Sequence, residues 1–64
     1  MTIRRTLYHR RAVLGWTQSQ LARKAKVSRS EISMIETGAT LHPLFRTVAR
    51  LCKALGIELD EVSG

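Results

Sequence analysis

Two helix-start signals lie close together in this chain and constrain its fold more than any other feature. Thr17 is followed three residues later by Gln20, and Ser28 is followed by Glu31 at the same spacing. In such a capping box the hydroxyl accepts a hydrogen bond from the backbone N–H three residues on, while the longer side chain bonds back to the cap residue. Because the two caps are eleven residues apart, we expect two short helices that begin at about residues 18 and 29 and are joined by a tight turn.

The apolar spacing predicts which faces of these two helices pack together. Leu21, Ala22 and Ala25 recur at helical spacing in the first helix, as do Ile32 and Ile35 in the second, so the pair should share one apolar seam. The opposite face of the second helix is short and polar, and it carries Ser30, Ser33, Met34 and Thr37, with Arg29 on its flank. Such a face suits the major groove of duplex DNA, because small side chains permit close approach and an arginine can bond to guanine.

This segment resembles the helix-turn-helix of the Cro/cI-type repressor family, whose domains are also described as XRE-like or lambda-repressor-like. The residues that match the family's opening and turn are Arg11, Gly15, Trp16, Thr17, Gln18, Ala22 and Val27. The residues that match its second helix and its tail are Ser28, Ile32, Ile35, Glu36, Gly38, Pro43, Thr47, Val48, Leu51, Ala54, Leu55 and Gly56. One departure is Lys26, where the family usually has glycine, and a left-handed backbone there costs about 1 kcal/mol.

We therefore expect one all-α domain over residues 1–64, a compact five-helix fold with its helix-turn-helix at about 17–37 and a basic N-terminal arm at 1–5. Helix one should run from a cap at Thr2 or Thr6 to about Leu14, with Leu7 and Leu14 facing inward. Pro43 is expected as the first residue of helix four, because its missing N–H would have no helical partner there. A last turn should lie at 59–62.

The distribution of charge points to a polyanionic partner. The formal net charge is +6, yet residues 1–29 hold eight basic groups and no acid, whereas residues 30–64 hold three basic groups and five acids. The basic end is the end that carries the helix pair. Duplex DNA would be a natural ligand, with log K falling by about 0.9 per decade of salt for each phosphate neutralised. The alternative is a solvated basic surface without a ligand.

Several side chains are candidates for DNA contact. Arg29 is predicted to read a base edge, the alternative being a phosphate or solvent. Ser30 and Ser33 either bond to bases or phosphates or are simply small enough to let the helix enter the groove, and neither interpretation is favoured. Met34 would touch a thymine methyl or face solvent. The predicted phosphate contacts are Gln18, Arg10, Arg23, Lys26 and Thr40.

Glu36 falls only about 70° from the centre of the apolar stripe, so it should be half buried and need a partner. The family resemblance implies that this partner is Arg11, in an ion pair that holds helix one against helix three. Glu31, by contrast, is assigned to the capping box rather than to base reading.

No catalytic or metal-binding pattern accompanies these motifs. The soft metal ligands are His9, His42 and Cys52, whose separations match no zinc spacing, and the cysteine lies on an apolar stripe. We expect no enzyme activity, no cofactor and no metal. Apolar runs are too short for a membrane span and the N-terminus lacks a signal-peptide core, so a cytoplasmic protein is expected.

These features predict sequence-specific binding of double-stranded DNA by a repressor-like transcriptional regulator. The resemblance implies a symmetric homodimer on a palindromic operator, with an interface around Leu41, Leu44, Phe45 and residues 57–62. The alternative is an antitoxin-type module that masks a protein partner, a toxin or another regulator, and binds DNA secondarily. Non-specific nucleic-acid condensation is a third hypothesis.

Overall fold

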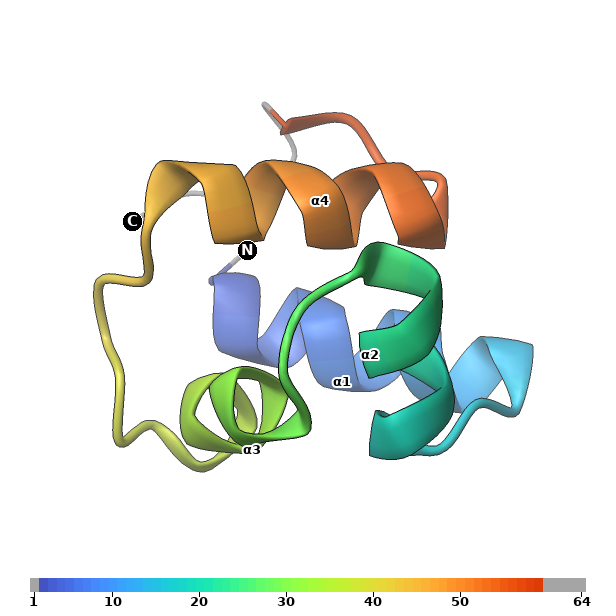
Figure 1. The fold of residues 1–64 in the computed structure, drawn as a ribbon, viewed down its shortest axis with the longest axis horizontal. Coiled ribbons are helices and arrows are strands. Elements are labelled where there is room, and N and C mark those ends of the chain that lie inside the picture. The colour runs from blue at the N-terminus through green and yellow to red at the C-terminus, as the bar shows by residue number, and fades with distance from the viewer. Residues whose placement is uncertain (1, 60–64) are drawn as a thin grey trace.

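The computed structural model describes residues 2–59, and this part of the chain contains four α-helices: α1 (Ile3–Leu14), α2 (Gln18–Ala25), α3 (Arg29–Thr37) and α4 (Phe45–Leu55). In Figure 1, α4 crosses the top of the view, α3 is seen almost end-on at the bottom, and α2 lies at the right between them. The all-α prediction is confirmed, but the count of five helices is not supported. Leu59 is assigned to a 3₁₀ turn, and residues 60–62 of the expected last turn lie outside the described residues.

Both predicted capping boxes are present. The backbone N–H of Gln20 donates to Thr17 Oγ1 at 3.1 Å, and that of Thr17 donates to Gln20 Oε1 at 2.8 Å. The second box repeats this pattern, with Glu31 N donating to Ser28 Oγ at 3.0 Å and Ser28 N to Glu31 Oε1 at 3.1 Å. Each box satisfies two backbone donors that a helix start leaves without intrahelical partners. The helix pair therefore begins where these local signals predict.

The turn between α2 and α3 is left-handed at Lys26, which has φ 60° and ψ 43°. The Lys26 N–H donates to Ala22 O, and Val27 N also donates to that oxygen at 3.1 Å. These bonds satisfy a carbonyl at the end of α2 that has no other helical partner. The turn is thus left-handed at a lysine, the position where the family resemblance leads one to expect glycine.

Helix α1 has its N-cap at Thr2 and its C-cap at Gly15, as predicted. Of the two residues predicted to face the core, one is not buried. Leu7 is fully buried, whereas Leu14 is 39% exposed. The last turn of α1 extends beyond the C-terminal end of α4 in Figure 1, so no neighbouring helix covers it there. Ile3, at the opposite end of α1, is buried instead.

Helix α4 begins two residues later than predicted. Leu44, not the residue before Pro43, is the N-cap, with an extended backbone at ψ 143°. The N-terminal end of α4 is tied to α3 by the Thr47 hydroxyl, which donates to Glu31 Oε2 at 2.8 Å. This tertiary contact holds the first turn of α4 in position. The preference of proline for the first turn of a helix could not predict where α4 begins, because it takes no account of such a contact.

The four helices meet around a single apolar cluster. Its members are Ile3, Leu7, Leu21, Ala22, Ala25, Ile32, Ile35, Leu51 and Leu55. The predicted seam between α2 and α3 is therefore confirmed, because the apolar residues predicted for both helices are buried in the same cluster. Within residues 2–59, no helix is long and apolar enough to cross a bilayer.

Candidate nucleic-acid interface

Helix α3 has one buried and one exposed face. Ile32 and Ile35 are 0% and 1% exposed, so they anchor the helix to the core. On the other side Arg29 and Ser30 are exposed, Met34 is 46% exposed and Ser33 is half-buried. A helix with this division can approach a ligand with its outer face while its inner face holds it in the fold.

Arg11 and Glu36 form a bidentate ion pair between α1 and α3. Arg11 Nε donates to Glu36 Oε2 at 2.8 Å and Arg11 Nη2 to Oε1 at 2.9 Å. The side chains are 16% and 6% exposed, and Arg11 Nη1 also donates to Trp16 O at 2.8 Å. The pair therefore joins α1, the loop before α2 and the end of α3.

The charge state of this pair follows from its contacts. Burial alone would raise the pKa of Glu36, but hydrogen bonds from Arg11 and Gln18 outweigh it and hold that pKa below its usual value. The hydrogen bonds to Glu36 raise the pKa of Arg11 in turn. Both groups are thus charged at neutral pH.

Gln18 has a structural role that the sequence did not reveal. Its Nε2 donates to Glu36 Oε1 at 3.1 Å, so the side chain completes the ion-pair network. Gln18 is also the first residue of α2, where the backbone N–H has no intrahelical acceptor. A phosphate contact at this residue would therefore use the backbone N–H and the positive end of the helix.

Arg10, which is predicted to contact a phosphate, has a partner within the chain. Its Nη2 donates to Leu55 O at 3.2 Å, at the C-terminal end of α4. Carbonyl groups at a helix C-terminus attract cations, which accounts for this position. The Arg10 guanidinium therefore caps the end of α4 in the structure, and its contact with a DNA phosphate stays a prediction.

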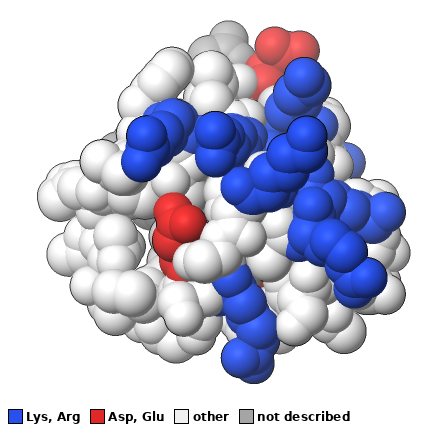
Figure 2. Space-filling view, in the orientation of Figure 1, with Lys and Arg blue, Asp and Glu red and all other residues white. Residues whose placement is uncertain are grey.

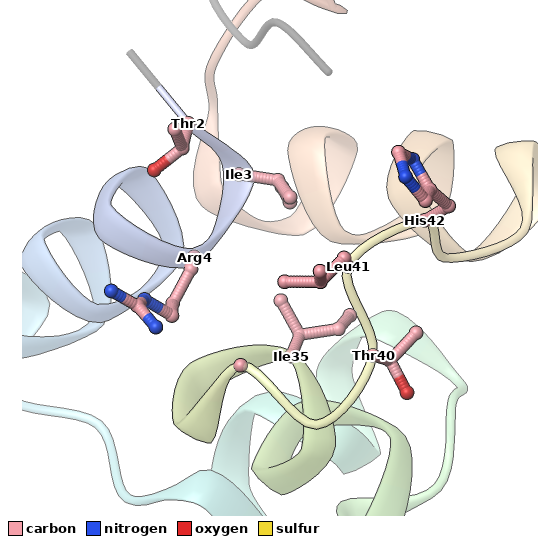
Figure 3. A pocket seen from close by; sticks show the side chains of 8 residues that line it. Thr2, Ile3, Arg4, Ile35, Thr40, Leu41 and His42 are labelled. Carbon is pink, nitrogen blue, oxygen red and sulfur yellow. The ribbon is translucent and has the colours of Figure 1, made fainter.

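The predicted basic arm is likewise part of a helix, because residues 3–5 form the first turn of α1. Figure 3 shows Arg4 beside the loop that follows α3, around a pocket that Ile3, Ile35 and Leu41 also line. A Cβ added to Gly38 would lie 2.6 Å from Arg4 Nη1, and Gly38 has φ +85°. Glycine at this position therefore allows both the turn and the approach of the arginine.

Three further residues were predicted to contact phosphates: Arg23, Thr40 and Lys26. Arg23 is exposed on α2, and Thr40 is half-buried, with its N–H donating to Met34 O at 3.0 Å. In Figure 3 the Thr40 hydroxyl points away from the pocket. Lys26, by contrast, lines a depression between α2 and α4.

Three basic residues of α4 were not among the predicted site residues: Arg46, Arg50 and Lys53. Their i, i+4, i+7 spacing puts them on one face of a helix that has no acidic residue. Figure 2 shows lysine and arginine side chains gathered over α4 and α2. The spacing was the signal that would have found this group.

Comparison with known protein families shows that the chain is similar to a helix-turn-helix family. A helix-turn-helix family model matches residues 7–62, which include α2, α3 and α4 and most of α1. No curated protein matches the chain.

Proposed function

The chain belongs to the Cro/cI-type helix-turn-helix family of DNA-binding transcription regulators, and from this premise we propose that it recognises a specific duplex sequence with α3 in the major groove. The observation that carries the proposal is the division of α3 into an anchored and an exposed face. Ile32 and Ile35 bury one side, while the side chains that flank Arg29 are small. A helix of this kind fits the width of the major groove.

We assign base reading to Arg29, Ser30, Ser33 and Met34. Arg29 is exposed at the first position of α3, so its guanidinium can reach a guanine edge and form two hydrogen bonds. Phosphate contacts are assigned to the Gln18 backbone N–H, Arg23 and Thr40. The Arg11 and Glu36 pair would act indirectly, because it holds α3 against α1, and Gln18 links the same carboxylate to α2.

We further propose that two copies bind one palindromic operator. Leu41, Leu44 and Phe45 are 66%, 60% and 75% exposed. Leu41 and Leu44 lie in the segment that links α3 to α4, and Phe45 is the first residue of α4. Large apolar side chains grouped in this way are typical of a protein contact. A two-fold dimer through this segment would set its two α3 helices about 34 Å apart along the duplex.

Selection of bound sequences from a random duplex pool at physiological salt tests the proposal. We expect enrichment of a two-fold symmetric sequence whose affinity exceeds that of a scrambled duplex by about 10³ or more. Equal affinity for all sequences would instead support non-specific condensation.

Sedimentation of the chain with and without the selected duplex tests the dimer. We expect two chains per duplex, and a shift toward one chain per duplex when Phe45→Glu is introduced. Monomers at high concentration in both states would contradict the dimer. In that case, stoichiometric copurification of another protein that is lost in Phe45→Glu would support the antitoxin-type alternative.

A further inference from the structure

A second basic surface lies between α2 and α4. Lys24, Lys26, Arg50 and Lys53 line a depression of about 470 Å³, and the other residues that line it are Ala25 and Ala54. All four basic side chains are exposed. We call these four residues the α2–α4 basic surface.

The local charge of this surface is not neutralised by the described part of the chain. Within residues 2–59, Arg11 and Glu36 form an ion pair. None of the four cations of the α2–α4 basic surface forms one with a described carboxylate. Neither the segment 18–26 nor the segment 45–55 contains an acidic residue. Four like charges around one depression repel one another, so an anion that enters it would be attracted by all of them.

Helix-end chemistry explains only part of this cluster. Arg50 Nη1 donates to Lys26 O at 3.3 Å and so caps the end of α2. Lys24 Nζ lies 4.9 Å from the centre of the Trp16 ring, a cation–π contact that holds it near the depression. Lys26 is the C-cap residue of α2 and Lys53 lies in the last turn of α4, where a positive charge also favours the helix end. Within residues 2–59 neither side chain takes part in a hydrogen bond or an ion pair, so both charges remain available to an anion.

The chemistry of the lining favours nucleic-acid phosphates over a protein partner. Apart from the cations, the lining is made of two alanines, so a protein would find no large apolar anchor there. The cations are open to solvent and distributed over two helices, which suits the spaced phosphates of an extended backbone.

The location of this surface separates it from the reading helix. In Figure 1, α4 lies at the top of the domain and α3 at the bottom, and in Figure 2 the basic side chains gather over α4 and α2. The domain measures 24 × 21 × 18 Å along its principal axes. Arg50 and Lys53 belong to α4, so they lie on the helix that is across the domain from α3.

We propose that the α2–α4 basic surface binds the phosphate backbone of a second duplex segment while α3 reads the first, so that the protein bridges two DNA segments. The inference rests on the proposed function, because it takes duplex DNA as the ligand of α3. It also reassigns Lys26 from the phosphates of the operator to those of the second segment.

The test is a capture experiment with the full chain. A biotinylated duplex of the selected sequence is immobilised and loaded with protein, and retention of a fluorescent duplex of scrambled sequence is measured. The fluorescence retained is divided by the amount of protein on the immobilised duplex, so that a variant that binds the immobilised duplex less well is not mistaken for one that has lost the second surface. We expect protein-dependent retention that falls steeply with added salt.

The decisive variant is Arg50→Gln/Lys53→Gln, and its matched control is Arg4→Gln/Arg5→Gln, which removes two charges from α1. Loss of two phosphate contacts lowers the salt slope by about 1.8, so capture of the second duplex should fall at least tenfold near 0.1 M salt. The affinity for the selected sequence should change less than twofold, and the control should retain capture. Thermal unfolding verifies that both variants are folded.

Two results would overturn the proposal: no retention of the second duplex by the wild-type protein, or an equal loss in the variant and the control. The same capture with a scrambled immobilised duplex separates this proposal from the proposed function. If the protein prefers no sequence but capture of the second duplex still depends on Arg50 and Lys53, the proposal of sequence-specific recognition by α3 is contradicted. The proposal that the α2–α4 basic surface binds a second duplex is then supported.

Discussion

The inner and outer faces of α3 differ in what holds each residue. On the inner face, Ile32 and Ile35 are packed in the core, and Glu36 accepts three hydrogen bonds from Arg11 and Gln18. On the outer face, Arg29 and its neighbours have no comparable network. The contrast teaches that a single nine-residue helix separates stability from recognition, and that the two roles should respond to different substitutions.

The largest expected effect is on the inner face. Glu36→Ala leaves Arg11 without its carboxylate in a largely buried site, so we expect the free energy of unfolding to fall by about 3 kcal/mol or more. Urea denaturation followed by circular dichroism measures it. The matched control is Glu58→Ala, which removes an exposed carboxylate and should change stability by less than about 0.5 kcal/mol. An unchanged midpoint in Glu36→Ala would show that the pair does not support the fold.

The next effect should appear only in binding. Arg29→Ala removes a guanidinium from the outer face, so the affinity for the selected sequence should fall by about 1–3 kcal/mol, while the free energy of unfolding stays within about 0.5 kcal/mol. Fluorescence anisotropy with the selected and a scrambled duplex gives both affinities. If Arg29→Ala weakens both duplexes equally, the outer face does not read bases. Loss of stability in this variant would remove the contrast between the faces.

A smaller effect is expected at the turn that sets the angle between α2 and α3. Lys26 has φ 60°, which costs a residue with a Cβ about 1–2 kcal/mol, and glycine loses about 0.4–1 kcal/mol through the entropy of the unfolded chain. Lys26→Gly should therefore stabilise the fold by about 0.5–1 kcal/mol, measured by urea denaturation. Lys24→Gly is the control, because glycine within α2 should destabilise it by about 0.5–1 kcal/mol. A stabilised control, or a destabilised Lys26→Gly, would contradict the assigned strain.

Local signals predicted the helix pair well. The capping boxes at Thr17 and Ser28 act over three residues, so the sequence contains all that is needed to place the starts of α2 and α3. At Lys26 the family pattern left open a strained left-handed turn or a somewhat different geometry, and the structure has the left-handed turn. Predictions of this kind depend on neighbours along the chain, and the structure agrees with them.

Predictions that required the tertiary arrangement were less accurate. Leu14 has the periodicity of a core residue, but the end of α1 extends past the helix that would cover it. The phosphate contacts of Arg10 and Gln18 stay predictions, but the intramolecular partners of these side chains, Leu55 O and Glu36, could not be derived from the sequence. The spacing of the α4 cations was visible in the sequence, but the depression that Arg50 and Lys53 share with Lys24 and Lys26 exists only once α2 is packed beside α4. Each of these outcomes depends on distances between residues far apart in the sequence.

The smallest expected effect concerns Glu31, which lies at the start of α3 and joins its capping box to α4. The backbone hydrogen bond from Ser28, followed by the bond from the Thr47 hydroxyl, lowers the pKa of Glu31 below the usual 4.5. The unfolded chain then binds more protons than the fold in this range, so stability decreases as pH falls from about 4.5 through the lower pKa of the folded state. Glu36 contributes in the same direction, because its pKa is also lowered.

Glu31→Gln separates the two contributions, because glutamine retains the capping box but does not titrate. At neutral pH the variant should be slightly less stable than the wild type, by less than the change at Lys26, since Glu31 is only partly buried. As pH falls below 4.5 this difference should shrink, while the pH dependence due to Glu36 remains. Urea denaturation at a series of pH values measures both curves. A difference that is constant with pH would mean that Glu31 acts only as a cap, so that the inner face alone makes the stability of α3 sensitive to acid.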